Sequence, residues 1–258
     1  MRLNKTTAIC LFALAAGNAV AQDSEPPETG YFKTSMTPIE VIGEADAKGM
    51  ADVFPSDEKL DWQLYVPHNY SADNPPGVIV YISPRENGGP PRAWNNLLSE
   101  NNLIWIGANG AGNKHPVAER MLKGLFAPSV LAKTYKINTD RLYVAGFSGG
   151  SMTAMRVAAV WPNKFKGGIY IAGAVFWEEN TPPKIDQIKE NRHVFIVGTY
   201  DEAMANTRRV YNDYKKAGVE NSELITIRNH QHRMPPTDYF VRAIEYLDSG
   251  LTYQDKEQ

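Results

Sequence analysis

A serine between glycines stands near the middle of the sequence, in the run Gly146-Phe147-Ser148-Gly149-Gly150. The apolar, β-prone residues 142–145 precede this run, and apolar residues at near-helical spacing follow it. A serine on a sharp turn between a strand and a helix stands clear of the sheet, and small residues two positions away on either side let strand and helix pass closely. A glycine-rich loop is the alternative, but it does not require these flanking patterns. The sequence therefore predicts a nucleophile at Ser148, with helix N–H groups behind it to stabilise an oxyanion.

A serine nucleophile on such a turn is served by an acid and then a histidine further along the chain. Asp201 follows an apolar run and would orient an imidazole, although aspartate at such a position also caps helices; Glu202 is the alternative acid. The run 229–236 contains His230 and His232, and either is a candidate base. The His-x-His pair is also a metal-binding pattern. No matching His, Asp or Glu cluster stands out elsewhere in the sequence, so we expect no metal and no cofactor.

Apolar runs alternate with helical patterns from residue 60 onward, and these elements must position the candidate residues. The alternation predicts an α/β fold with a mostly parallel sheet and helices on both faces. Ligand sites in such sheets lie beyond the C-terminal ends of the strands. The expected strands are 61–67, 78–82, 103–107, 142–145, 168–172, 194–198 and 223–227, and the expected helices are 93–100, 117–135 with an interruption near Pro128, one from the elbow to Trp161-Pro162, 204–217 and 236–247. Residues 38–42 are a candidate edge strand, and 175–192 a linking segment.

The first residues have the character of a signal peptide. Arg2 and Lys5 precede a short apolar run, residues 8–16, and Ala19-Val20-Ala21 is a small-x-small cleavage site. We therefore expect residues 1–21 to be removed on secretion or export to the periplasm, followed by an N-terminal leader with a possible edge strand (22–55) and a catalytic domain (56–258). The one cysteine, Cys10, lies in the signal, so we expect no disulfide in the mature chain.

Charge and hydropathy argue against two classes of partner. The formal net charge of −2 becomes −4 when Arg2 and Lys5 are removed, because residues 1–21 contain no acid. A weakly acidic chain without a basic stripe is a poor candidate for binding nucleic acid. No second apolar stretch reaches the length of a membrane span, so we expect no transmembrane segment.

The order serine, acid, histidine on alternating strands and helices resembles the α/β-hydrolase superfamily. Within it, residues 60–247 resemble the secreted esterases grouped with polyhydroxybutyrate depolymerases and feruloyl esterases, and more distantly prolyl-oligopeptidase-type hydrolases. The matching residues are 141–152 (RLYVAGFSGGSM), Trp161-Pro162 with Phe165 and Gly167, and a His-x-x-Pro pattern from His232 to Pro235. This resemblance favours His232 over His230. It implies an α/β-hydrolase fold without a large cap domain, and acyl transfer in which Ser148 attacks a carbonyl, His232 is the base and Asp201 orients His232.

The resemblance also implies an oxyanion hole, in which the N–H of Gly149 is one donor. The second donor usually follows the strand at 78–82, where such enzymes commonly carry His-Gly. This chain has Ser83-Pro84-Arg85-Glu86 instead, and proline has no N–H. We therefore expect the second donor from Ser83, Arg85 or a neighbouring residue, or else an oxyanion hole that is built differently. The side chains of Arg85 and Arg92 are exposed loop charges or, alternatively, bind a substrate carboxylate.

The substrate is the least constrained part of this interpretation. About 20 residues separate the strand at 168–172 from Val194, too few for a cap domain, so an open site for a bulky or polymeric ester is expected. Trp94, Trp177 and His115 are candidate substrate contacts, with a core position the alternative for each tryptophan. His68 and His193 are expected at the surface. A carboxylic esterase is the leading hypothesis; a serine peptidase of prolyl-oligopeptidase type and a non-catalytic binding protein that retains the fold are the alternatives.

Overall fold

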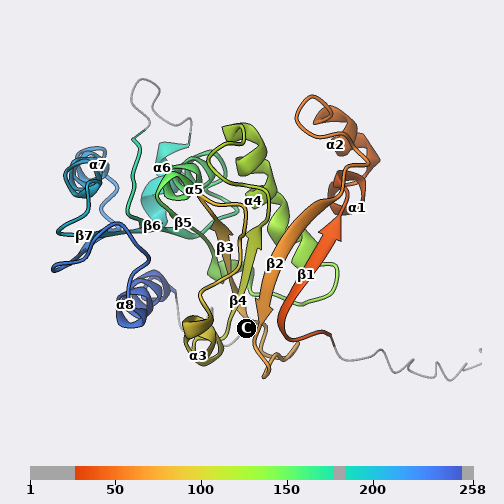
Figure 1. Cartoon of the computed structure of the whole chain (residues 1–258), viewed down its shortest axis with the longest axis horizontal. Helices are drawn as coiled ribbons and strands as arrows, with labels where there is room; N and C mark the ends of the chain where they lie inside the picture. Colours follow the sequence, from red (N-terminus) through yellow and green to blue (C-terminus); the bar gives the residue numbers. More distant parts are fainter. Residues whose placement is uncertain (1–26, 177–183, 252–258) are drawn as a thin grey trace, which may run out of the picture.

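The computed structural model describes residues 27–176 and 184–251, and Figure 1 shows their arrangement. Within these residues an eight-stranded sheet has the order β1-β2-β4-β3-β5-β6-β7-β8. β2 pairs antiparallel with β1 and β4, and the later pairings are parallel. The predicted α/β fold with a mostly parallel sheet is confirmed. The strands are β1 (Gly30–Met36), β2 (Leu60–Val66), β3 (Gly77–Ile82), β4 (Leu103–Ala108), β5 (Leu142–Phe147), β6 (Gly167–Ile171), β7 (Arg192–Gly198) and β8 (Ser222–Ile227).

Helices cover both faces of this sheet, as predicted (Figure 1). On one face the buried residues come from α3 and α8, and on the other from α4, α5, α6 and α7. The helices are α1 (Pro38–Ile42), α2 (Glu44–Gly49), α3 (Asn95–Glu100), α4 (Val117–Leu131), α5 (Gly149–Val160), α6 (Ile185–Glu190), α7 (Met204–Lys216) and α8 (Thr237–Asp248), with 3-10 turns at Arg92–Trp94 and Thr139–Arg141.

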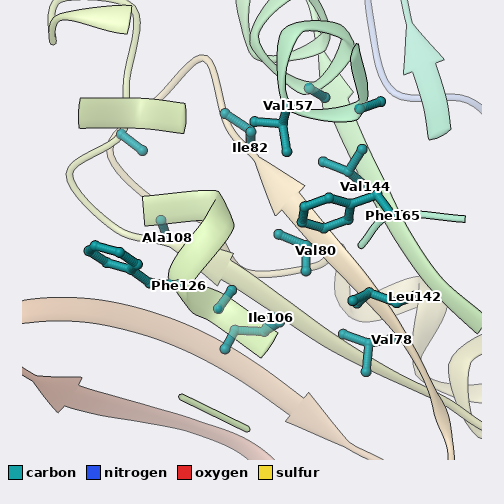
Figure 2. Packing of buried hydrophobic residues seen from close by; sticks show 14 of the residues in the cluster. Val78, Val80, Ile82, Ile106, Ala108, Phe126, Leu142, Val144, Val157 and Phe165 are labelled. Carbon is teal, nitrogen blue, oxygen red and sulfur yellow. The ribbon is translucent and has the colours of Figure 1, made fainter. Parts of the chain in front are cut away.

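The central strands are apolar throughout because their side chains alternate between two cores. On β3, Val80 and Ile82 belong to the core beneath α4 and α5, whereas Tyr81 belongs to the core beneath α3 and α8. Figure 2 shows the first set packed with Phe126 of α4 and Val157 of α5. This double burial fixes the ends of the central strands, from which the candidate residues project.

The edge strand lies earlier in the chain than expected. The prediction of a strand at 38–42 is wrong, because these residues form α1, and the edge of the sheet is β1 instead. The reason is a capping box that the apolar pattern conceals. Thr37 Oγ1 accepts a hydrogen bond from the N–H of Glu40, and the Glu40 carboxylate accepts one from the N–H of Thr37. Pro38 then takes the first helical position, where its missing N–H costs nothing.

Two helical segments also differ from expectation. α4 runs through Pro128 to Leu131, so the predicted interruption near Pro128 is wrong. Phe126 and Val130 on either side of the proline are buried in the core, and tertiary packing of this kind commonly outweighs local propensity. The segment expected to link β6 to β7 contains α6, whose Ile188 is buried in the same core.

His193 is a core residue, and its predicted surface position is wrong. His193 is 1% exposed, and both of its ring nitrogens are hydrogen-bonded. Nδ1 accepts a hydrogen bond from the Tyr170 hydroxyl at 2.9 Å, and Nε2 donates to the carbonyl of Ile188 at 3.1 Å. Burial lowers the pKa of His193 to about 4, so the ring is neutral at pH 7.

Candidate active site

Ser148 occupies the turn between β5 and α5 that the sequence predicts. Its backbone has φ 53° and ψ −126°, a conformation that L-residues rarely adopt. The flanking glycines are required by close approach: a Cβ at Gly146 would overlap the backbone of Gly150, and a Cβ at Gly150 would overlap the carbonyl oxygen of Ile82. The turn therefore has the strained strand-to-helix geometry of a nucleophile elbow.

Two further side chains form a continuous hydrogen-bonded chain with this serine. His232 Nε2 lies 2.9 Å from Ser148 Oγ, and His232 Nδ1 lies 2.9 Å from Asp201 Oδ1. Ser148 follows β5, Asp201 follows β7 and His232 follows β8, so three strand ends supply the group. With Nδ1 protonated and donating to the carboxylate, Nε2 has a lone pair available for the serine proton.

The Asp201 carboxylate is buried beside His232. Its side chain is 1% exposed, whereas that of His232 is 33% exposed. Asp201 Oδ1 also accepts a hydrogen bond from the N–H of Ala203 at 2.8 Å, while Oδ2 is buried without a partner among the described residues. The carboxylate therefore depends on His232 for much of its compensation, because a buried charge is costly without partners. This contact orients the imidazole.

The alternative acid and base lie apart from this chain of contacts. Glu202 is exposed and makes no hydrogen bond with any residue that the structure describes. His230 is buried, and its ring contacts Arg233: Nε2 donates to the Arg233 carbonyl at 3.2 Å, and the Arg233 guanidinium donates to Nδ1 at 3.4 Å. The structure thus brings Asp201 and His232 to Ser148, and places His230 with Arg233.

One of the expected oxyanion donors, the N–H of Arg85, is hydrogen-bonded within the loop after β3. The N–H of Arg85 donates to Ser83 Oγ at 3.0 Å, which closes a local turn around Pro84. Asn113, from the loop after β4, lies directly against Gly149 instead. A Cβ at Gly149 would lie 2.7 Å from Asn113 Nδ2 and would overlap Oδ1, so the side-chain amide is beside the N-terminus of α5.

The loops after β3 and β4 are locked together at this point. The N–H of Asn113 donates to the Pro84 carbonyl at 3.0 Å. The guanidinium of Arg120 on α4 donates to the carbonyl of Ala111 at 2.7 Å and to that of Ser83 at 3.3 Å. Arg120 is 4% exposed, and two carbonyls compensate its buried charge. Both loops are therefore held rigidly beside the elbow.

A cavity of about 370 Å³ opens beside His232, whose Nε2 contacts Ser148 Oγ. This volume is within the range of small-molecule sites. Its walls come from the loop after β3, from Phe147 and from the loop after β8, and they combine apolar residues with hydrogen-bond donors. The lining residues are Tyr81, Ser83, Pro84, Arg85, Asn87, Gly89, Pro90, Pro91, Phe147, His232, Arg233 and Met234.

The structure places the residues that were predicted to contact substrate in different environments. Trp94 does not line this cavity: it is 2% exposed and stacks on Phe240 of α8, with ring centroids 4.1 Å apart, so the prediction for Trp94 is wrong. Trp177 lies outside the described residues. His115 is half-buried between Glu86, 3.0 Å from Nε2, and Glu119, 3.6 Å from Nδ1.

Sequence reasoning missed three polar residues that border the site: Tyr81, Asn113 and Arg233. The hydroxyl of Tyr81, on β3, donates to Met234 Sδ at 3.7 Å, a weak acceptor. Each residue stands in a strand or loop next to a recognised motif, but no local pattern separates it from a core tyrosine or a solvated loop residue. Only the packing of the strand ends brings them together.

Within residues 27–176 and 184–251, every helix is too short or too polar to span a lipid bilayer. In the same two ranges, His, Cys, Asp and Glu side chains do not gather into a group of three that would hold a metal ion.

No family model matches the chain. A curated relative, the probable acetylxylan esterase A of Aspergillus clavatus, is 28% identical over a segment covering 43% of this chain and 40% of that protein. This chain therefore spans about two fifths of the length of the curated relative that it matches.

Solved structures with this architecture include esterases and a peptidase. A mutant feruloyl esterase module from Clostridium thermocellum in complex with sinapinate has a TM-score of 0.60 and 14% identity, over 86% of this chain and 89% of that one. Est1E from Butyrivibrio proteoclasticus gives 0.55 and 18%, over 74% and 94%, and Porphyromonas gingivalis dipeptidyl peptidase 4 gives 0.54 and 15%, over 75% and 34%. At these identities the likeness establishes the fold, and the chain has the α/β-hydrolase fold that the sequence resemblance implied.

Proposed function

We propose that this protein is a serine hydrolase that cleaves carboxylic esters through an acyl-enzyme on Ser148. The observation that carries the proposal is the hydrogen-bonded chain from Ser148 through His232 to the buried Asp201. Ser148 Oγ lies 2.9 Å from His232 Nε2, and His232 Nδ1 lies 2.9 Å from Asp201 Oδ1. This geometry activates a serine hydroxyl. A binding protein that had lost catalysis would have no need of this alignment.

The reaction follows from the positions of the protons. Ser148 Oγ attacks the ester carbonyl carbon while His232 Nε2 takes the hydroxyl proton. The tetrahedral intermediate expels the alcohol, which takes the proton back from Nε2, and leaves an acyl-enzyme. Water then attacks the acyl carbon with His232 again as base, and the carboxylic acid leaves as Ser148 Oγ regains its proton. Asp201 keeps the imidazole in the required tautomer and stabilises its cationic form.

We infer that the oxyanion is stabilised by the N–H of Gly149 and by the side-chain amide of Asn113. An ideal Cβ lies about 2.5 Å from the amide nitrogen of its own residue, so Asn113 Nδ2 is within roughly 5 Å of the Gly149 N–H given the 2.7 Å contact. One oxygen atom between the two groups can accept from both. The Arg85 N–H, engaged by Ser83 Oγ, is less available, and Ser83 supports the turn that holds it.

An ester substrate is favoured over a peptide by the comparisons. Esterases are matched over most of their length, 89% and 94%, whereas 34% of the dipeptidyl peptidase chain is covered. The cavity reaches the surface beside a partly exposed His232, so a bulky or polymeric ester has access. We further propose that residues 1–21 are removed on export, which a mature N-terminus at Gln22 in mass spectra would support.

Labelling with a fluorophosphonate probe tests the proposal without knowledge of the natural substrate, because the probe reacts with activated serines. We expect the wild-type protein to be labelled at Ser148, and Ser148→Ala and His232→Ala to remain unlabelled. The matched control is His68→Ala, which removes an exposed histidine away from the elbow and should label normally. A folded wild-type protein that does not react would contradict the proposal, and a panel of ester and amide substrates would distinguish esterase from peptidase.

A further inference from the structure

The cavity beside His232 is lined by three residues with hydrogen-bond donors, two of which are arginines. Tyr81, Arg85 and Arg233 all line it, and each places a donor at a different wall: β3, the loop after β3 and the loop after β8. The remaining walls are largely apolar, with three prolines, Phe147 and Met234. None of the lining residues that the structure describes is an acid. A ligand in this cavity would therefore meet apolar surface and two positive charges.

Arg233 is exposed, and contacts with the buried His230 position it. The buried His230 donates from Nε2 to the Arg233 carbonyl and accepts at Nδ1 from the Arg233 guanidinium. This double contact requires a neutral imidazole, since a protonated ring has no lone pair to accept with. It fixes both ends of the arginine beside the cavity without neutralising its charge. His230 is thus a positioning residue for Arg233.

Arg85 and Tyr81 supply the other donors. The Arg85 guanidinium makes no ion pair or hydrogen bond within the part of the chain that the structure describes. Tyr81 is 6% exposed as a residue, and among the described residues its hydroxyl donates to the weak acceptor Met234 Sδ. Burial raises the pKa of Tyr81, so the hydroxyl keeps its proton and remains a donor.

Two carboxylates of the described chain that adjoin Arg85 and His232 have other partners. Glu86 follows Arg85 in sequence, but its carboxylate lies 3.0 Å from His115 Nε2 and 3.6 Å from Lys114 Nζ. Asp201 is engaged by His232. Arg92, on the same loop as Arg85, lies over the Tyr31 ring at 5.1 Å and does not line the cavity. Among the described residues that line the cavity, Arg85 and Arg233 therefore supply the positive charge, next to the candidate base.

We propose that this cavity binds a carboxylate carried by the ester substrate, held by Arg85, Arg233 and the Tyr81 hydroxyl, while the apolar walls contact the carbon skeleton between that carboxylate and the scissile bond. The inference rests on the proposed esterase function and specifies its substrate class: esters that bear a second, ionised acid group. Arginine is suited to this role because its planar fork pairs with both carboxylate oxygens.

Two matched pairs of substrates test the proposal and locate the carboxylate. On the acyl half, 4-nitrophenyl monoglutarate is compared with 4-nitrophenyl pentanoate. On the alcohol half, 4-acetoxybenzoate is compared with its methyl ester. We expect kcat/KM to favour the anionic member of at least one pair by about tenfold or more, as a charge-assisted hydrogen bond near a reacting centre provides. The preference should decline with added salt.

Variants assign the preference to the named residues. Arg85→Gln and Arg233→Gln should each lower the anionic-to-neutral ratio of kcat/KM about tenfold, and Tyr81→Phe by a smaller factor. His230→Gln should lower the ratio through Arg233 and raise KM for the anionic ester more than it changes kcat. The matched control is Arg92→Gln, which removes a charge from the same loop outside the cavity and should leave the ratio unchanged.

The outcomes separate this inference from the function on which it rests. Hydrolysis of all four esters without a preference for the anionic members would overturn the carboxylate site and leave the esterase intact. A preference that Arg92→Gln lowers as much as Arg233→Gln does would also overturn it, because the effect would be general surface charge. A folded protein that hydrolyses no ester and resists the fluorophosphonate would overturn both.

Discussion

Asp201 and Glu202 are adjacent acids with opposite environments, one buried against His232 and the other exposed. We expect Asp201→Asn to lower kcat on the order of a thousandfold, because the amide would favour the wrong imidazole tautomer and could not stabilise the imidazolium. Glu202→Gln is the matched control and should retain wild-type kcat. Steady-state hydrolysis of 4-nitrophenyl acetate measures both. Equal losses in the two variants would show that general charge near the site, and not orientation of His232, explains the effect.

Asn113 provides a second test at the scale of one residue. Replacement by alanine removes the proposed side-chain donor, so kcat should fall on the order of a hundredfold while KM changes little, since the lost contact is strongest in the transition state. Asn113→Asp should fall at least as far, because a carboxylate offers no donor and repels the oxyanion. Thermal unfolding of each variant checks the fold. An unchanged kcat in Asn113→Ala would contradict this role and would indicate that a backbone N–H after β3 is the second donor.

At the scale of the element, the elbow depends on contact between β3, β5 and α5. A Cβ at Gly150 would overlap the Ile82 carbonyl oxygen, and backbone atoms in a sheet cannot move aside cheaply. Gly150→Ala should therefore displace α5 from β3, lowering kcat more than tenfold and the free energy of unfolding by about 2 kcal/mol or more.

Gly49, in α2, is the matched control for that substitution. A Cβ there would meet nothing within 4 Å, so Gly49→Ala should leave activity unchanged and stabilise the protein by up to about 1 kcal/mol, as alanine does in a helix. Urea unfolding and ester hydrolysis of the two variants give the comparison. Equal behaviour of both would mean that the elbow accommodates a side chain and that the close approach is not required.

The elements differ in how far sequence alone predicts them. β3, β5 and β7 are continuous apolar runs buried on both faces, and helices between them follow from periodicity. α1 was concealed because Val41 and Ile42 suit a strand as well as a helix, and only the reciprocal contacts of Thr37 and Glu40 decide between them. α4 continues past Pro128 because of packing that no local pattern encodes.

The site divides in the same way. Ser148 and His232 stand in motifs whose chemistry restricts residue type and spacing, so they are predictable, and Asp201 follows from the order of the partners. Asn113 and Arg233 are ordinary loop residues in the sequence. Asn113 depends on a contact with a loop more than 25 residues away, since its N–H bonds the Pro84 carbonyl. Arg233 is held by the neighbouring His230, and only the packing of the loop after β8 brings both residues to the cavity. Such pairings arise from tertiary structure and leave no local signal.

At the scale of the whole molecule, His193 is a buried titratable ring whose charge responds to acid. His193 lies among Tyr170, with a hydroxyl contact of 2.9 Å, and Tyr214, with ring centroids 5.4 Å apart. Burial lowers the pKa of His193 to about 4 from 6.5, and burial also raises the pKa values of both tyrosines. The tyrosines therefore stay neutral, and His193 alone of the three gains charge in acid.

The sign of the pH effect follows from proton linkage. Between pH 6.5 and 4 the unfolded chain binds a proton at His193 that the folded protein does not, so stability is full above pH 6.5 and falls as the pH is lowered. The loss should approach about 1 kcal/mol per pH unit within that window.

Urea unfolding from pH 7.5 to 4.5 tests this expectation. The free energy of unfolding should decline less steeply with falling pH for His193→Gln than for the wild-type protein, whatever the variant's stability at pH 7.5. His68→Gln, which removes an exposed histidine, should keep the wild-type slope. Parallel profiles for the wild-type protein and His193→Gln would show that other groups govern the acid response.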